Sequence, residues 1–218
     1  MRTKNKSKEN KSKIRNILKI VFLLIIVGVA IVFLKKDKKV DEEKPRDCVQ
    51  VDVKNHLYRG QCLEEGYVPE NLVPLSPRAS WLNTKQYLDI RAKVVVEQLI
   101  QDAEDDGMCL VVASGFRTVE EQQELLDLAE DKSMVAKPNE SEHQTGLAVD
   151  FVACPMTNGV RDDSAERLEL EKPFEELPEY KWLQDNAWKY DMEQSYTIDT
   201  IVESQYAIES WHWKLILR

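Results

Sequence analysis

Residues 141–151 read SEHQTGLAVDF, and this stretch decides how the folded part of the chain is organised. Gly146 permits a sharp turn after the loop that carries His143, because glycine adopts backbone conformations that other residues avoid. The following residues, 147–152, read as a buried strand that can bring Asp150 back alongside His143. A carboxylate on an otherwise buried strand needs a partner, because an unpaired buried charge is costly. A metal ion would supply that partner.

A second polar segment lies near the C-terminus, where residues 209–213 read ESWHW. Two histidines and one carboxylate leave a fourth position for water, which is the arrangement of a catalytic zinc site. A further carboxylate beside the metal can accept the proton of that water. Glu209, on the turn before His212, is placed for this role. Glu142 is the alternative base, but it adjoins His143 and is expected to point away from the metal.

The remaining pattern predicts an α+β domain with a small antiparallel central sheet flanked by helices. Helices come first, strands with long loops between them follow, and this order favours antiparallel pairing. Spacing and capping signals define the expected elements. These are a helix between Thr84 and Gly107, a strand at Met108–Ala113, a helix at 119–130 after a capping box of Thr118 and Glu121, a loop at Ala136–Gln144, a strand at Leu147–Val152, a helix at Leu177–Tyr190 and a strand at Trp211–Leu217.

The four cysteines, Cys48, Cys62, Cys109 and Cys154, bear on the compartment and on the kind of metal site. None belongs to a Cys-x-x-Cys pair, so the sequence gives no sign of a zinc site built from cysteines. Cys48 and Cys62 could close a short loop, and Cys109 and Cys154 lie in strand-like runs that could be neighbours. Disulfides at both pairs fit an extracytoplasmic domain. Four inert thiols are the alternative.

Charge is divided unevenly along the chain. Residues 1–46 contain fourteen Lys/Arg and five Asp/Glu, whereas residues 47–218 contain sixteen Lys/Arg and thirty-four Asp/Glu. A basic tail on an acidic body argues against nucleic acid as a partner, because phosphate binding needs a cationic face on the folded part. The basic residues instead flank an apolar run, which indicates a membrane.

That apolar run, residues 17–34, is interrupted only by Lys19 and is long enough to cross a bilayer core. The heavier basic flank precedes it, so residues 1–16 are expected to form a cytoplasmic tail. Lysines follow the run without a small-x-small cleavage site, which favours an uncleaved transmembrane anchor over a secretory signal peptide. Residues 35–47 read as a solvated tether. Residues 48–218 are then the extracytoplasmic domain, and the protein is a single-pass protein of the cell membrane.

Taken together, the polar segments resemble a known family. SEHQTGLAVDF at 141–151, followed by ESWH at 209–212, is similar to the signature of VanY-type D-alanyl-D-alanine carboxypeptidases. These are zinc peptidases related to the VanX dipeptidases and to L,D-carboxypeptidases of the cell wall. Residues 114–118, SGFRT, resemble the family's S-G-Y/F-R-S/T element. The resemblance covers roughly residues 55–218.

The resemblance implies Zn²⁺ as cofactor and a role for each residue of the site. His143, Asp150 and His212 become the zinc ligands. Glu209 becomes the general base, and Arg117 becomes the group that holds the scissile carbonyl as it gains negative charge. The alternative for Arg117 is a surface salt bridge.

Substrate contacts are implied in the same way. Ser141 and Gln144 are expected beside the metal, where they hydrogen-bond the terminal carboxylate or the backbone of the substrate. Trp211 and Tyr206 are expected to line the pocket, with core packing as their alternative. Ser114, from the SGFRT element, completes the expected substrate-binding set.

The function implied by the resemblance is that of a zinc-dependent D,D-carboxypeptidase. It would remove the C-terminal D-alanine from the stem pentapeptide of peptidoglycan or of its lipid-linked precursor, with a link to glycopeptide (vancomycin) resistance. An L,D-carboxypeptidase that trims tetrapeptide stems is the nearest alternative. A non-catalytic, zinc-containing wall-binding module is the alternative of another class, and the base Glu209 argues against it.

Two departures from the family pattern bear on substrate detail. Ser210 stands where the family commonly has the proline of E-P-W-H, a position that shapes the turn. The stretch Tyr190–Tyr196 also lacks the Gly-Phe pair and the arginine that family members often show there.

Overall fold

The computed structural model describes residues 48–81, 84–157, 160–161 and 173–218. The expected cytoplasmic tail, transmembrane anchor and tether, residues 1–47, lie outside this part of the chain. Among the described residues, no helix has both the length and the apolar character needed to cross a bilayer.

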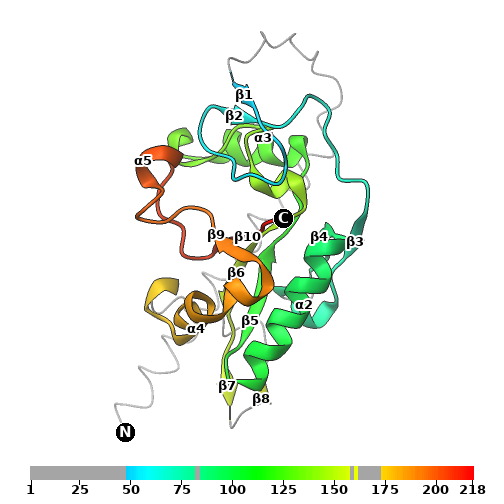
Figure 1. Ribbon diagram of the computed structural model, residues 1–218, viewed down its shortest axis with the longest axis vertical. Coiled ribbons are helices and arrows are strands. Elements are labelled where there is room, and N and C mark those ends of the chain that lie inside the picture. The colour runs from blue at the N-terminus through cyan, green and yellow to red at the C-terminus, as the bar shows by residue number, and fades with distance from the viewer. Residues whose placement is uncertain (1–47, 82–83, 158–159, 162–172) are drawn as a thin grey trace, which may run out of the picture. The chain divides into compact units, whose positions relative to one another are not determined.

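A four-stranded antiparallel sheet lies at the centre of the domain (Figure 1). Its strands, in spatial order, are β5 (Leu110–Ser114), β6 (Ala148–Ala153), β10 (His212–Leu215) and β9 (Met192–Gln194). Strands β5, β6 and β10 correspond to the three strands that the sequence predicts, and β9 is an addition. The prediction of an α+β domain with a small antiparallel sheet is confirmed.

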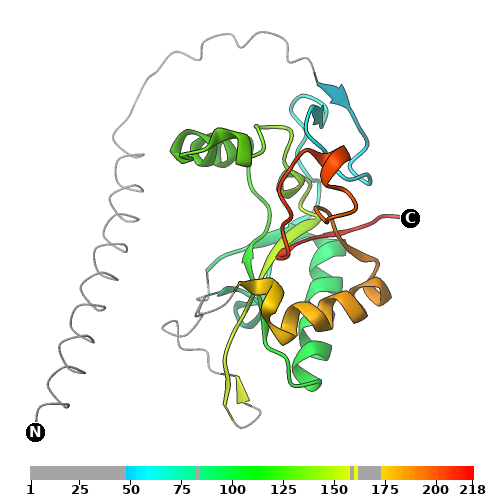
Figure 2. The same ribbon diagram turned by 90° about the vertical axis from the view of Figure 1, so that its left-hand side faces the viewer.

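The sheet has two different faces because side chains alternate along each strand. One face packs against α2 (Ile90–Asp105) and α4 (Pro178–Asn186), which lie next to each other in Figure 2. The hydrophobic core on this face includes Ala92, Val96, Leu99, Val112, Val149, Phe151, Leu183, Trp213 and Leu215. Asp150 and His212 each precede a core residue of their strand, so their side chains lie on the other face.

Helix α2 begins at Ile90, later than the helical pattern after Thr84 predicts. Residues Tyr87–Asp89 form β4 instead, and this strand pairs with β3 (Leu72–Pro74). The Asp89 carboxylate then caps the helix by accepting a backbone N–H from its first turn. The local helical pattern predicts too early a start, because the long-range pairing of β4 with β3 overrides it.

The other predicted helices are confirmed. Thr118 and Glu121 form the expected capping box at the start of α3 (Val119–Leu128). Helix α4 continues into the 3₁₀ turn η6 (Ala187–Tyr190), which accounts for the predicted helix at 177–190. Short elements that the sequence does not predict complete the described part of the fold. They are β1 (Val49–Gln50), β2 (Gln61–Cys62), η1 (Pro77–Ala79), η3 (Lys132–Met134), η4 (Glu142–Thr145), β7 (Met156–Thr157), β8 (Val160–Arg161), η5 (Phe174–Glu176) and α5 (Ile201–Ser204).

Both suggested cysteine pairs form disulfides, so the alternative of four inert thiols is wrong. Cys48–Cys62 closes the N-terminal loop, in which β1 and β2 pair in parallel. Cys109–Cys154 joins the chain just before β5 to the chain just after β6, within a small apolar cluster separate from the main core. Each bridge restricts the unfolded chain and so favours the folded state.

Gly146 fixes the turn between η4 and β6. Its φ of +68° lies in the left-handed region. Its carbonyl accepts a hydrogen bond from the backbone of Asp89 at 2.9 Å. A Cβ at Gly146 would lie 3.0 Å from that same nitrogen and 3.2 Å from Leu72 Cδ2. Glycine is therefore required both by the backbone conformation and by the close approach of the β3–β4 hairpin.

We expect Gly146→Ala to lower the free energy of unfolding by more than the roughly 1–2 kcal/mol that a left-handed alanine costs. Gly107→Ala is the matched control, because Gly107 has a φ of +82° but open space around its Cβ position. Urea unfolding of the full-length protein and of both variants measures the difference. Equal losses in the two variants would contradict the account of the close approach.

Candidate metal centre and active site

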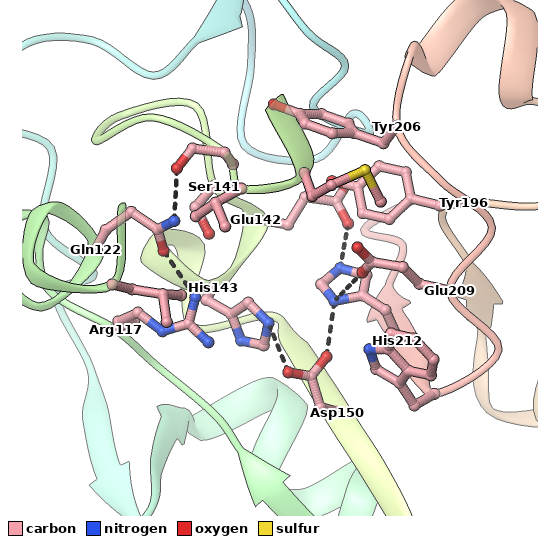
Figure 3. Close-up of a pocket in the computed structure, with 15 residues that line it drawn as sticks. Arg117, Gln122, Ser141, Glu142, His143, Asp150, Tyr196, Tyr206, Glu209 and His212 are labelled. Carbon is pink, nitrogen blue, oxygen red and sulfur yellow. Dashed lines mark hydrogen bonds and ion pairs between the residues drawn. The ribbon is translucent and has the colours of Figure 1, made fainter. Parts of the chain in front are cut away.

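His143, Asp150 and His212 come together from three separate elements, η4, β6 and the start of β10 (Figure 3). Asp150 lies between the two imidazoles. Its Oδ2 is 3.2 Å from His143 Nε2, and its Oδ1 is 2.9 Å from His212 Nδ1. One ligand atom from each residue lies within 4.8 Å of the other two. The structure therefore brings together the three ligands that the sequence predicts.

Strand register explains why two of these side chains meet. His212 and Asp150 are direct cross-strand partners in the antiparallel β10–β6 pair. Residues directly opposite each other across such a pair point to the same face and lie in contact. His143 reaches the same place from η4, because the turn at Gly146 leads straight into β6.

The second nitrogen of each imidazole is also occupied. His143 Nδ1 lies 2.7 Å from the Gly115 carbonyl oxygen, and His212 Nε2 lies 2.9 Å from Glu142 Oε2. Metal-bound histidines typically donate their other N–H to a carbonyl or carboxylate in this way. The remaining nitrogens face Asp150, and two imidazole nitrogens with one carboxylate oxygen suit zinc. The residues present therefore fit the ion.

Electrostatics favour a cation at this place. Burial alone would raise the pKa of Asp150, but the charge and hydrogen bond of His143, together with His212, hold this pKa well below its ordinary value. Burial lowers the pKa of His143. Burial would also lower the pKa of His212, but hydrogen bonds to Asp150 and Glu142 raise it to about 10. The two carboxylates around this imidazole thus attract a proton or a metal cation.

Glu209 lies beside the cluster and lines the same pocket. Its Oε2 is 4.0 Å from His212 Nδ1. Burial raises the pKa of Glu209, and the charges of Asp150 and Glu142 act in the same direction. A carboxylate with a raised pKa is suited to take up a proton and return it. The alternative base, Glu142, is bound to the far nitrogen of His212, pointing away from the cluster as expected.

Arg117 borders the pocket on the side opposite Glu209 (Figure 3). Its Nη1 donates to Gln122 Oε1 at 2.7 Å and its Nη2 donates to Ser114 Oγ at 2.9 Å. Both partners are neutral, so these two contacts fix the guanidinium without neutralising its charge. Burial lowers the pKa of Arg117, although an arginine stays protonated in proteins. These contacts do not match the alternative of a surface salt bridge.

Three of the expected substrate-binding residues, Ser141, Tyr206 and Trp211, line the pocket. Trp211 is 40% exposed, so it is not a core residue. Tyr206 is buried, and the guanidinium of Arg59 lies over its ring at 4.7 Å from the centroid.

The other two expected substrate-binding residues lie elsewhere. Gln144 is buried and points away from the pocket, where its amide bonds Asn139 and the Tyr67 carbonyl. Because the oxygen and the nitrogen of this amide both have protein partners, Gln144 stabilises the loop that carries Asn139 and is not oriented to bind substrate. Ser114 accepts its hydrogen bond from Arg117 and so positions that side chain. It does not belong to the pocket lining.

Among the pocket residues that the sequence analysis does not predict, two have hydrogen-bonding side chains that support the site, Gln122 and Tyr196. Gln122 bridges Arg117 and the Ala136 carbonyl, to which its Nε2 donates at 2.6 Å. The sequence signal for Gln122 is its polar side chain on the buried face of the expected helix at 119–130. Tyr196 stacks on His212 with ring centroids 5.0 Å apart, and its hydroxyl donates to the Leu57 carbonyl. No local pattern marks it, because its partners are far away in the sequence.

The fold and the site together define the class: an α+β protein with the His–Asp–His ligand set and adjacent carboxylate of mononuclear zinc hydrolases. The VanY family model, described as D-alanyl-D-alanine carboxypeptidase, matches residues 85–216. The chain belongs to this family.

Curated relatives agree with this assignment. A D-alanyl-D-alanine carboxypeptidase of Enterococcus faecalis is 30% identical over 151 residues, covering 62% of this chain and 50% of that protein. The putative carboxypeptidase YodJ of Bacillus subtilis is 31% identical over 139 residues, covering 61% of this chain and 47% of that protein. The chain thus spans about half the length of the curated relatives it matches.

Solved structures share the fold. The LdcB LD-carboxypeptidase superposes with a TM-score of 0.62 and 26% identity, covering 81% of this chain and 84% of that chain. A mutant of the D,D-pentapeptidase VanY from a VanB-type resistance cassette, in complex with Zn(II), gives a TM-score of 0.58 and 27% identity, covering 76% and 88%. VanYB in complex with D-alanine-D-alanine superposes with a TM-score of 0.56 and 26% identity, covering 76% of this chain and 87% of that chain.

Proposed function

We propose that this protein is a zinc-dependent D,D-carboxypeptidase that removes the C-terminal D-alanine from peptidoglycan stem pentapeptides. The observation that carries the proposal is the convergence of the His143–Asp150–His212 cluster with Glu209 and Arg117 on one pocket. Membership of the VanY family supports it. The Zn(II) complex of one structural relative supports zinc as the ion, and the D-alanine-D-alanine complex of another supports this dipeptide as the end of the substrate.

A zinc ion held by the cluster would supply Lewis acidity and a water molecule of lowered pKa. Glu209 accepts a proton from the attacking water and returns it to the departing amine of D-alanine. Its raised pKa suits both directions of this transfer. The peptide bond before the last residue breaks, and the free D-alanine and the shortened stem peptide leave.

Arg117 stabilises the carbonyl oxygen of the scissile bond as that oxygen gains negative charge. Hydrogen bonds to Gln122 and Ser114 hold the guanidinium in place before the substrate arrives. A donor that is already oriented does not have to reorganise during the reaction, which makes its stabilisation larger. The half-buried position of Arg117 adds to this effect, because charges interact more strongly away from water.

The pocket walls are suited to the end of a peptide. Ser141 offers a hydroxyl beside the cluster, while Leu125, Met134 and Trp211 give apolar surface. Leu125, Met134 and Trp211 are each at least 40% exposed, so this surface is open to solvent. We assign it to the methyl groups and aliphatic side chains that precede the scissile bond.

L,D-carboxypeptidase action on tetrapeptide stems is the second candidate. The likeness to the LdcB LD-carboxypeptidase favours it, with a TM-score of 0.62 over 81% of this chain. The same ion, base and arginine serve either reaction, because both release a terminal D-alanine and the reacting bond differs only in the residue that precedes it. We prefer the D,D reaction because the family model that matches this chain is described as D-alanyl-D-alanine carboxypeptidase.

The proposed location is the outer face of the cell membrane. The apolar run at 17–34 supplies the anchor, and the basic flank before it favours a cytoplasmic N-terminus. A tether of residues 35–47 reaches at most roughly 45 Å when extended. The domain would then meet stem peptides near the membrane, including those of the lipid-linked precursor. Loss of terminal D-alanine there would contribute to glycopeptide resistance.

Glu209→Gln should lower D-alanine release from a pentapeptide by about 10²- to 10⁴-fold, because the amide cannot accept the proton. Zinc content should stay near that of the wild type, measured by elemental analysis of the same full-length preparation. His143→Ala is the companion variant and should lose zinc and activity together. Full activity in Glu209→Gln would remove that residue from the mechanism.

A comparison of stem peptides separates the two carboxypeptidase reactions. Pentapeptide should be shortened with a kcat/KM at least tenfold above that for tetrapeptide, measured as D-alanine released by the full-length protein. The physical reason is the fit of a D-alanine, not a longer L-configured residue, before the scissile bond. The reverse ratio would assign the L,D reaction.

Cell fractionation tests the location. The full-length protein should sediment with membranes, and protease added to intact spheroplasts should digest residues 48–218. Deleting residues 1–34 should move the domain out of the membrane fraction. A protease-resistant domain in intact spheroplasts, digested only after lysis, would contradict the proposed orientation.

A further inference from the structure

A fully buried carboxylate, that of Glu142, lies directly behind His212. Its side chain is 0% exposed. Oε2 accepts hydrogen bonds from His212 Nε2 at 2.9 Å and from the hydroxyl of Ser195. The buried ammonium of Lys214 lies 3.6 Å from Oε1. Every one of these neighbours is a donor or a cation, so the carboxylate acts as an acceptor throughout.

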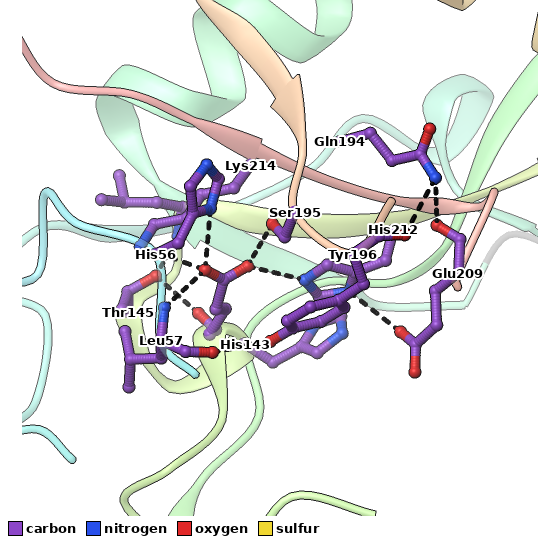
Figure 4. Close-up of polar contacts among 12 residues, drawn as sticks. His56, Leu57, His143, Thr145, Gln194, Ser195, Tyr196, Glu209, His212 and Lys214 are labelled. Carbon is purple, nitrogen blue, oxygen red and sulfur yellow. Dashed lines mark hydrogen bonds and ion pairs between the residues drawn. The ribbon is translucent and has the colours of Figure 1, made fainter. Parts of the chain in front are cut away.

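The other side of Glu142 is contacted by the loop Cys48–Cys62, which its own disulfide closes. Leu57 donates its backbone N–H to Oε1 at 2.9 Å, and His56 Nδ1 lies 3.1 Å from the same oxygen. Figure 4 shows His56 and Leu57 meeting the network from the side opposite His212. Leu57 is completely buried. The loop residues therefore contact a carboxylate that lies 85 and 86 positions further along the chain.

The same loop contacts the walls of the pocket. The Leu57 carbonyl accepts the hydroxyl of Tyr196, which stacks on His212. Arg59 lies over the ring of Tyr206 at 4.7 Å and donates to the Ser133 carbonyl. The loop thus touches the support of the metal cluster and two residues that line the pocket, Tyr196 and Tyr206, although it contributes no ligand.

We propose that the disulfide-closed loop Cys48–Cys62 is a positioning element for the metal ligand His212, acting through Glu142, and that it sets the affinity of the site for zinc. The proposal rests on the zinc site of the proposed function. The loop precedes residues 85–216, to which the family model matches, so the family assignment does not itself include it.

The physical basis is the choice of ring nitrogen. A carboxylate at Nε2 keeps the proton there and leaves Nδ1 free to face Asp150 and an ion. Glu142 can do this only while its own orientation is fixed. Two of its bonds come from a loop whose conformational freedom the Cys48–Cys62 bridge limits. Greater mobility of the loop should therefore weaken zinc binding, because the orientation of Glu142 would no longer be fixed.

Zinc affinity tests the proposal, measured by competition with a chromophoric chelator on the full-length protein. Glu142→Gln keeps the shape of the side chain but removes its charge, and we expect zinc to bind about 10- to 100-fold more weakly. The double variant Cys48→Ser with Cys62→Ser should weaken zinc binding in the same direction by a smaller factor. His56→Ala, which leaves the disulfide intact, should also weaken it.

The second disulfide supplies the matched control. Cys109→Ser with Cys154→Ser also removes a bridge, but from the apolar cluster at the ends of β5 and β6. It should lower the unfolding temperature while zinc affinity stays within about twofold of the wild type. Equal loss of zinc affinity in the two double variants would reduce the effect to general destabilisation and overturn the proposal.

The remaining outcomes are also decisive. Wild-type zinc affinity in Glu142→Gln would overturn the role of the carboxylate. A weakened Glu142→Gln beside an unchanged His56→Ala and an unchanged Cys48/Cys62 variant would overturn the role of the loop. A wild-type protein that binds no zinc would instead contradict the proposed function, so the two failures are distinguishable.

Discussion

The pairing of β6 with β10 is the constraint on which the site depends. Its register sets His212 directly opposite Asp150, and the alternation of the two strands sends both side chains to the face away from the hydrophobic core. A slip of one residue would exchange them with Trp213 and Val149, which belong to that core. The apolar contacts of one face therefore fix the polar geometry of the other. The turn at Gly146 adds the third ligand, because it joins the segment that carries His143 directly to β6.

Around this pair, the two histidines and Arg117 are oriented by neighbours that take no part in the chemistry. Gly115 and Glu142 occupy the outer nitrogens of the two histidines. Gln122 and Ser114 hold Arg117, whose positive charge faces the pocket. These supports come from β5, α3, η4 and the disulfide-closed loop, so most of the domain contributes to one site. Asp150 and Glu142 keep low pKa values in spite of burial, because histidines and Lys214 surround them. The arrangement is stable as a whole but sensitive to the loss of any one partner.

Much of this could be read from the sequence where the signal is local. The glycine turn and the alternation around Asp150 bring that carboxylate to His143, and the resemblance to the VanY-type family implies His212 as the third ligand. Thr118 with Glu121 predicts the start of α3. Features that depend on distant partners could not be read. The helical pattern misses the true start of α2 because β4 pairs with β3. The family resemblance implies a substrate contact for Gln144, but its amide instead bonds the backbone of Asn139 and Tyr67. The sequence predicts that Glu142 points away from the metal. It does not predict that His56 and Leu57 contact the Glu142 carboxylate. Pairing across long separations is a property of the folded chain, and no local spacing encodes it.

We propose that two imidazoles and one carboxylate, from His143, Asp150 and His212, hold a zinc ion with one position left open. X-ray absorption at the zinc edge of the full-length, zinc-loaded protein measures this most directly. We expect two histidine nitrogens at about 2.0–2.1 Å and oxygen ligands at about 2.0–2.2 Å, with no sulfur. Both cysteine pairs are in disulfides, in agreement with that absence of sulfur. A spectrum with sulfur ligands near 2.3 Å, or with fewer than two imidazoles, would contradict the account.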